Sequence, residues 1–231
     1  MVKIKVTKPL RGVKKKSGQN YQDYVIRDGR LIGDWEGLYK NFADPWNQSR
    51  SDQLLDSRRM VALNWCCRLR DEYQVSRVLE VGCGFGHLTD ALREKGLSSI
   101  GTDISRTAVA KARQLHPASL FFEAAVTDFS AVAKFDADVY LMSEVTWYIL
   151  DGLDGFLANL KKQSQVRRKP VFLIHLLSIY APGVQKYGSE KFTTLDEILA
   201  YFNLEYLESG LVRSSRQDDR DARGTYFVAR I

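Results

Sequence analysis

Cysteine is scarce in this chain of 231 residues, and the three that occur, Cys66, Cys67 and Cys83, do not follow the spacing of a metal site. Adjacent cysteines such as Cys66 and Cys67 rarely form a disulfide with each other, and an odd total argues against a disulfide framework. We therefore expect neither a metal site nor a disulfide. Free thiols are typical of reducing compartments, so a cytoplasmic location fits best.

Long apolar stretches are also missing. No run approaches the ~20 apolar residues that a membrane-spanning helix requires. The basic N-terminus is not followed by the apolar segment of a secretory signal. An apolar content of 45% suits an ordinary globular core. The length predicts one large domain, or one domain with an N-terminal extension.

Acidic residues are absent from positions 1–20, which hold seven lysines and arginines. Because the whole chain has a net charge of +6, the remainder carries about −1. RNA-binding domains usually present a basic surface, so nucleic acid is not the expected partner of the main body. We interpret residues 1–20 as a mobile, solvated arm. Contact of this arm with an anionic substrate or polymer is the alternative.

A glycine-rich turn is the most informative feature that the sequence does contain. The apolar run 78–81 leads directly to Gly82, Gly84 and Gly86, and residues 88–92 then show helical spacing. A strand, a glycine turn and a helix begin a nucleoside-binding βαβ unit. Glycine permits a positive φ and lets a ligand approach the backbone closely, while the amides at the helix start face an anionic group.

Two acids flank this turn at informative positions. Glu80 precedes the first glycine by two residues, and the next strand, 98–102, ends in Asp103. A carboxylate about 20 residues beyond the turn is where a ribose-binding acid is found. The glycine spacing is G-x-G-x-G rather than the G-x-G-x-x-G of dinucleotide-binding proteins. The sequence therefore predicts a nucleoside-containing cofactor and disfavours a dehydrogenase.

Apolar spacing predicts the remaining elements. We expect a hairpin at 24–32, a helix at 35–42 that ends before Pro45, and a long helix at 51–73. The expected strands cover 77–81, 98–103, 121–125, 139–142, 171–174, 204–214 and 225–231, and the helices between them cover 87–95, 105–115, 153–162 and 195–202. This order predicts an α/β fold with a seven-stranded, doubly wound sheet.

Four segments together resemble the motifs of class I S-adenosylmethionine-dependent methyltransferases. They are VLEVGCGFG from Val78, GTDIS from Gly101, FFEAAVTDFS from Phe121 and FDADVYLMSEVTWYIL from Phe135. More narrowly, LYKNFADPWNQSR, the long helix after it and SEVTWYIL resemble the nodulation-protein-S-like branch. That branch methylates amines on sugars or oligosaccharides.

The resemblance implies a Rossmann-like methyltransferase fold with an N-terminal helical and hairpin extension. It implies S-adenosyl-L-methionine as cofactor, S-adenosyl-L-homocysteine as product, and a small molecule or saccharide as acceptor. It also implies three parts: the basic arm at 1–20, an extension at 21–75 that covers the active site, and a cofactor-binding catalytic domain at 76–231.

Residues that follow the family motifs are expected to bind this cofactor. They are Glu80, Gly82, Cys83, Gly84 and Gly86 in the turn, Asp103 and Ile104 after the second strand, Thr127, Asp128 and Phe129 after the third, Ser143 after the fourth, and Tyr39 and Trp46 in the extension. Asp103 would bind the ribose and Asp128 the adenine amino group; a helix cap and a local turn are the respective alternatives. Tyr39 and Trp46 would face the sulfonium or only fasten the extension. A catalytic thiol at Cys83 is disfavoured, because no basic neighbour in the sequence would lower its pKa.

Candidate catalytic and substrate-binding residues follow the later strands. Glu144, Trp147 and Tyr148 come after the fourth strand, at the sheet edge where ligands of open α/β sheets bind. Glu144 would orient an amine, while Trp147 and Tyr148 would line the acceptor pocket or pack in the core. His175, in the fifth strand, is either the base that a hydroxyl acceptor needs or a buried histidine without a catalytic role. Tyr180 belongs to an aromatic loop suited to covering a substrate.

Other functions stay open from the sequence. An RNA methyltransferase that uses the arm 1–20 as a tether is the main alternative to a small-molecule enzyme. A nucleotide-dependent dehydrogenase and a non-catalytic cofactor-binding protein are the others. In the long helix, Arg58 and Arg59 would either reach a carboxylate or lie on a solvated face.

Overall fold

The computed structural model describes residues 20–49, 57–167, 169–180, 184, 187–188, 190–212 and 222–231. The basic arm predicted at 1–20 lies outside the described residues, apart from Asn20. The same holds for the first residues of the predicted long helix, which is described from Ser57 onward.

Seven strands form one mixed sheet in the order β5-β4-β3-β6-β7-β9-β8. Their bounds are β3 Arg77–Val81, β4 Ser98–Asp103, β5 Leu120–Glu123, β6 Val139–Ser143, β7 Phe172–Tyr180, β8 Glu205–Val212 and β9 Ala222–Arg230. The strands from β5 to β7 pair in parallel, whereas β9 pairs antiparallel with β7 and with β8. The predicted seven-stranded, doubly wound sheet is therefore confirmed.

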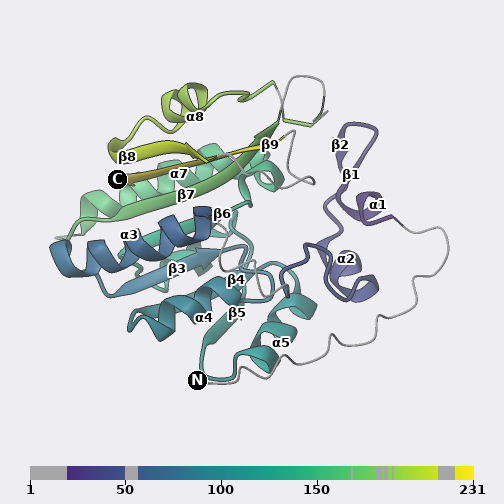
Figure 1. Cartoon of the computed structure of the whole chain (residues 1–231), viewed down its shortest axis with the longest axis horizontal. Coiled ribbons are helices and arrows are strands. Elements are labelled where there is room, and N and C mark those ends of the chain that lie inside the picture. The colour runs from purple at the N-terminus through teal and green to yellow at the C-terminus, as the bar shows by residue number, and fades with distance from the viewer. Residues whose placement is uncertain are drawn as a thin grey trace, which may run out of the picture.

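Helices cover both faces of this sheet (Figure 1). They are α3 Ser57–Tyr73, α4 His87–Glu94, α5 Arg106–Leu115, α6 Phe129–Ala133, α7 Leu150–Val166 and α8 Leu195–Phe202. In β6, Tyr140 and Met142 face the core beneath α7, while Val139 and Leu141 face the core beneath α3 and α4. This alternation follows from the two-residue period of a strand. Among the described helices, none has the length and apolar character to cross a bilayer.

An N-terminal extension stands beside the sheet and is present as predicted (Figure 1). It consists of α1 Gln22–Val25, a hairpin of β1 Ile26–Arg27 and β2 Arg30–Leu31, and α2 Trp35–Asn41. The hairpin is shorter than the predicted one, because α1 takes up its first residues. We call residues 20–49 the cover, since they lie against α5 and the glycine turn, as described below.

Helix starts were predictable where a side chain caps them. The Thr194 hydroxyl accepts a hydrogen bond from the Glu197 amide at 3.2 Å, and the Glu197 carboxylate accepts one from the Thr194 amide at 3.1 Å, which forms a capping box at the predicted start of α8. The short helix α6 was not predicted, and its start is capped by Asp128. Five residues are too few to show a clear helical period.

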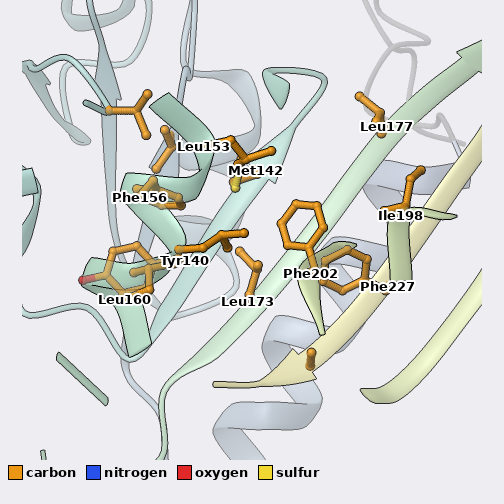
Figure 2. Close-up of a cluster of buried hydrophobic side chains, with 14 of the residues drawn as sticks. Tyr140, Met142, Leu153, Phe156, Leu160, Leu173, Leu177, Ile198, Phe202 and Phe227 are labelled. Carbon is orange, nitrogen blue, oxygen red and sulfur yellow. The ribbon is translucent and has the colours of Figure 1, made fainter. Parts of the chain in front are cut away.

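Aromatic side chains fill the core between the C-terminal strands and α8. Figure 2 shows Phe202 of α8 beside Phe227 of β9, and their ring centres are 4.9 Å apart. Both rings are fully buried. Phe202 and Ile198 are the buried residues of α8, and they attach this helix to the core.

We expect Phe202→Ala to lower the free energy of unfolding by about 3–5 kcal/mol, because it removes a fully buried ring and leaves a cavity. Val166→Ala is the control: Val166 is 80% exposed at the end of α7, and its truncation should change stability by less than about 0.5 kcal/mol. Urea denaturation measures both variants. Equal small effects would show that α8 is not held through Phe202.

Candidate functional site

The glycine turn connects β3 to α4. Gly82, Gly84 and Gly86 adopt φ values of 70°, 55° and 76°, which only glycine takes without strain. The places that their side chains would occupy are filled by other residues of the protein: Val145 at Gly82, Gln48 at Gly84 and Phe121 at Gly86. Glycine is thus required here by close packing as well as by backbone conformation.

Asp103 is tied to this turn by its carboxylate. It ends β4, is 7% exposed, and accepts hydrogen bonds from the Gly84 amide and the Ser105 amide, both at 2.9 Å. Burial raises its pKa, although the amide donors oppose the shift. Ser105, not Asp103, caps α5 by accepting from the Ala108 amide at 3.1 Å. The alternative role of Asp103 as a helix cap is therefore taken by another residue.

Glu80 lies under the turn rather than on its open side. Its buried carboxylate accepts a hydrogen bond from the Thr89 hydroxyl of α4. Burial raises the pKa of Glu80 to about 7, partly offset by the Thr89 bond and by the charge of Arg59. Cys83 is also buried, and burial raises the pKa of its thiol well above the ordinary value. A thiolate nucleophile is therefore disfavoured at this position.

The predicted adenine-binding residues differ in exposure: Ile104, Thr127 and Asp128 are exposed, whereas Phe129 is partly buried. Ile104 follows Asp103 and is 52% exposed, which is unusual for a large apolar side chain. Asp128 caps α6, because one of its oxygens accepts from the Ser130 hydroxyl at 2.7 Å and the Ala131 amide at 3.2 Å. Thr127 is exposed and Phe129 packs against the core beneath α7. The local role of Asp128 is thus present, and its contact with adenine stays a prediction.

Hydrogen bonds fasten both ends of the cover beside the site, and the Lys111 ammonium donates another to the Ala43 carbonyl between them. Glu36 of α2 accepts hydrogen bonds from the Ser105 hydroxyl at 2.7 Å and from the amide and hydroxyl of Thr107 at 3.1 Å and 2.7 Å. These donors lower the pKa of Glu36 to about 2. At the other end, the side-chain oxygen of Gln48 accepts from the Phe85 amide at 3.0 Å. Neither Glu36 nor Gln48 was singled out in the sequence, because each contact joins distant parts of the chain.

Aromatic residues lie between these two fastenings. Tyr39 is buried against Phe85, with ring centres 5.5 Å apart, and its hydroxyl accepts from the Trp46 indole at 3.1 Å. Burial and the nearby charge of Asp103 raise the pKa of Tyr39. Tyr148 packs against both Trp35 and Trp46, with ring centres 4.8 Å and 5.7 Å apart. We call Trp35, Tyr39, Trp46 and Tyr148 the aromatic wall.

Glu144 lies beyond Tyr148, at the end of β6 that Ser143 closes. It has a φ of 59°, a conformation that non-glycine residues rarely adopt outside sites under constraint. Its carboxylate accepts from the amide and hydroxyl of Ser178 at 2.9 Å and 3.1 Å, and it pairs with Arg58. Arg58 also donates to the Ser178 hydroxyl at 2.6 Å. The solvated face considered for Arg58 is therefore wrong, since its side chain is 19% exposed and ion-paired.

Arg59, the next residue of α3, differs from Arg58 in having a buried nitrogen, Nη1, without a hydrogen-bond partner. Its charge acts on Glu80 and on His87, which stand on opposite sides of the glycine turn. Arg59 belongs to the first turn of α3, and α3 packs against α4, the helix that follows the glycine turn. Buried donors without a partner are rare and demand an explanation.

One of the predicted substrate-binding residues, Trp147, lies in the core. Trp147 is buried against Phe192, and its indole donates to the Ser178 carbonyl at 2.8 Å. Tyr180 ends β7 and is 38% exposed. Of the predicted substrate-binding residues, Tyr148 thus belongs to the aromatic wall, Tyr180 lies at an exposed strand end and Trp147 is part of the core; their contact with a substrate stays a prediction.

His175 is enclosed by protein on every side. Its ring is fully buried, stacks on Phe227 and packs against Phe202, both with ring centres 4.8 Å away. Its Nε2 atom forms a hydrogen bond of 2.7 Å with the Thr146 hydroxyl. Burial lowers its pKa to about 3. The structural role, which was the alternative for His175, matches this packing, whereas its role as catalytic base stays a prediction.

Comparisons with known proteins identify the architecture. Residues 79–164 match a protein-family model described as a methyltransferase domain. Comparison with curated proteins finds no match to this chain. Solved structures that share the fold include the following two. The N-methyltransferase NodS from Bradyrhizobium japonicum WM9, in complex with S-adenosyl-L-homocysteine, is 17% identical over 90% of this chain and 96% of its own, with a TM-score of 0.58. The bifunctional kinase-methyltransferase WbdD is 17% identical over 80% of this chain, with a TM-score of 0.59.

This chain covers only 42% of the WbdD chain. At 17% identity, both likenesses show the fold. Together with the family match, they confirm the resemblance to class I S-adenosylmethionine-dependent methyltransferases and to NodS-like relatives that the sequence motifs predicted.

The burial of His175 predicts a response to acid. An imidazole with a pKa of about 3 in the folded state and about 6.5 when unfolded stabilises the fold above pH 6.5 and loses that contribution as the pH falls. We expect His175→Phe to gain about 2 kcal/mol relative to the original chain between pH 8 and pH 5. Urea denaturation at both pH values measures this difference. A pH-independent difference would mean that His175 is not held neutral by burial.

The buried carboxyl of Glu80 predicts the opposite trend. With a pKa of about 7 when folded and about 4.5 when unfolded, it stabilises the fold fully below pH 4.5 and loses that contribution as the pH rises through 7. Between pH 5 and pH 8 we expect Glu80→Gln to gain about 2–3 kcal/mol relative to the original chain. The same titrations test it, with Glu94→Gln on the exposed end of α4 as control. A parallel response of both variants would contradict the assignment.

Proposed function

We propose that this chain is an S-adenosylmethionine-dependent methyltransferase whose acceptor is the amine of a small molecule or saccharide. One observation carries the proposal. The buried carboxylate of Asp103 accepts a hydrogen bond from the Gly84 amide, where two neighbouring strands end next to the aromatic wall. Ligands of open α/β sheets bind at this edge.

The residues around the turn suit the parts of the cofactor. The Asp103 carboxylate accepts from amides at both oxygens and would also accept from a ribose hydroxyl of the cofactor. Ile104 offers an exposed apolar surface for the adenine ring. The buried Nη1 of Arg59 lacks a partner and would donate to the carboxylate at the amino-acid end of the cofactor.

When bound, the cofactor supplies a methyl group on a positively charged sulfur. The aromatic wall contributes two things to that reaction. Tyr39 and Trp46 extend from the neighbourhood of Asp103 towards Tyr148, so they exclude water from the path between donor and acceptor. Their ring faces also attract a cation, by about 0.5–2 kcal/mol.

Glu144 would hold the acceptor at the far end of this wall. A carboxylate alone raises the pKa of a neighbouring amine and keeps it protonated, which opposes methyl transfer. Arg58 pairs with Glu144, and Ser178 donates two hydrogen bonds to it, so its charge is partly compensated. Glu144 can therefore orient an amine by a hydrogen bond while holding its proton less firmly than a bare carboxylate would.

An amine suits this site better than a hydroxyl group. A hydroxyl acceptor needs a base within hydrogen-bond reach, and His175 is shut inside the core. An amine needs no protein base once it has lost its proton to water. Burial beside the aromatic wall favours that loss, because desolvation lowers the pKa of an amine.

Two measurements test the function. Titration calorimetry with S-adenosyl-L-homocysteine should show binding, and radiolabelled S-adenosyl-L-methionine should label amines in a panel that pairs amino sugars and aliphatic amines with their hydroxyl counterparts. The absence of heat at millimolar S-adenosyl-L-homocysteine would overturn the proposal. Labelling restricted to the hydroxyl compounds would overturn the preference for amines.

Asp103→Ala should weaken S-adenosyl-L-homocysteine binding by about 1.5–3 kcal/mol, because it removes buried, charged hydrogen-bond acceptors. Asp71→Ala removes an exposed carboxylate on α3 and should leave the affinity unchanged. Calorimetry on both variants, with circular dichroism to check folding, makes the comparison. An Asp103→Ala protein that folds and binds as tightly as the original would remove Asp103 from the site.

A further inference from the structure

Gln48 occupies a fixed position at the end of the cover. Asp44 accepts hydrogen bonds from the amides of Gln48 and Ser49 at 2.7 Å and 2.8 Å, and Asn47 between them adopts a φ of 52°. This closed turn sets the direction in which the Gln48 side chain leaves the backbone. It points to the glycine turn, where its oxygen accepts from the Phe85 amide.

That contact also fixes which end of the carboxamide faces which way. The Phe85 amide can only donate, so the oxygen of Gln48 must face it. The carboxamide lies over Gly84, with its oxygen nearest and its nitrogen, Nε2, 2.7 Å from where a side chain at that position would begin. Among the residues that the structure describes, none accepts a hydrogen bond from this nitrogen. The glycine turn is therefore faced by a preoriented donor that has no protein acceptor.

A second donor without an acceptor belongs to α3, which packs against the helix that follows this turn. Nη1 of Arg59 is buried and unpartnered. The pKa of His87, which is lowered by burial, His116 and Arg59, is also affected by Asp44. Asp44, which holds the turn of Gln48, and Arg59 thus both act electrostatically on His87, the first residue of α4 after the glycine turn. Two donors, one of them cationic, match the two oxygens of a carboxylate.

We propose that Gln48 is a cofactor-binding residue whose Nε2 donates to the carboxylate at the amino-acid end of S-adenosyl-L-methionine, opposite Arg59. This inference rests on the proposed function and deepens it. It makes the cover part of the binding site and assigns it the end of the cofactor that does not carry the nucleoside. The same contact makes the affinity depend on how the cover sits.

Two ligands separate this role from a merely structural one. S-adenosyl-L-homocysteine has the amino-acid end, whereas 5′-methylthioadenosine has the same nucleoside and thioether but lacks that end. Gln48→Glu keeps an oxygen for the Phe85 amide and replaces the donor by a negative charge. Gln48→Ala removes both the oxygen that accepts from the Phe85 amide and the Nε2 donor. Gln114→Ala, on the exposed surface of α5, is the matched control.

We expect both Gln48 variants to bind S-adenosyl-L-homocysteine about tenfold or more weakly, as befits the loss of a hydrogen bond to a charged group. Binding of 5′-methylthioadenosine should change less than twofold, and Gln114→Ala should match the original chain with both ligands. Calorimetry measures all the affinities without requiring an acceptor.

Several results would overturn the assignment. Equal weakening with both ligands would make Gln48 only a fastening of the cover. Unchanged S-adenosyl-L-homocysteine affinity in Gln48→Glu would show that no carboxylate lies there. Tighter binding by Gln48→Ala would show that the side chain blocks the site. If the original chain binds neither ligand, the proposed function itself fails, which is distinguishable from all three.

Discussion

The hydrogen bond from the Gly84 amide to the Asp103 carboxylate is the interaction on which the rest of the site depends. It joins the turn after β3 to the tip of β4. The sheet already pairs these strands in parallel, with Val81 opposite Thr102, and the Cys83 amide continues the pairing by donating to the Thr102 carbonyl at 2.9 Å. The turn is therefore held as an extension of the sheet, and its backbone conformation is set before any ligand arrives.

The same carboxylate connects the sheet to the cover. Asp103 accepts from the Ser105 amide, and the Ser105 hydroxyl donates to Glu36 of α2. At the opposite end of the cover, Gln48 reaches the amide next to Gly84. The two ends of the cover therefore contact the neighbours of the two residues that form this hydrogen bond: Glu36 binds Ser105 near Asp103, and Gln48 binds Phe85 next to Gly84. A displacement of α2 would therefore shift Ser105 and Asp103, and a displacement of the loop after α2 would shift the glycine turn.

Local patterns made most of the fold predictable, and the lack of local patterns explains the rest. Alternating burial in β6 and the capping box at Thr194 are encoded by residues close together in the chain. Gln48 and Phe85, in contrast, are 37 positions apart, and Glu36 and Ser105 are 69 apart. Contacts at such separations leave no periodic trace in one sequence.

His175 shows that a local sequence pattern can also leave two roles open for one residue. Its position in a strand between apolar residues allowed both a catalytic and a structural role. The outcome was decided by rings that arrive from α8 and β9, the latter by antiparallel pairing of Phe227 with His175. Asp128 is similar, because its capping of α6 depends on a helix too short to predict. The motifs located the site, whereas the roles of individual side chains depended on tertiary packing.

Two of the buried titrating groups, Glu80 and His175, have a joint consequence for the stability of the fold. Between about pH 5 and pH 6.5 the unfolded chain would carry its proton on the histidine, and the folded chain would carry it on the carboxyl. Folding in this range relocates one proton within the chain and exchanges almost none with the solvent at these two positions. As the pH falls in this range, the buried histidine lowers the free energy of unfolding and the buried carboxyl raises it. The two slopes are nearly equal and opposite, at about 1.4 kcal/mol per pH unit. The two contributions therefore nearly cancel, and together they leave the stability of the fold almost independent of pH in this range.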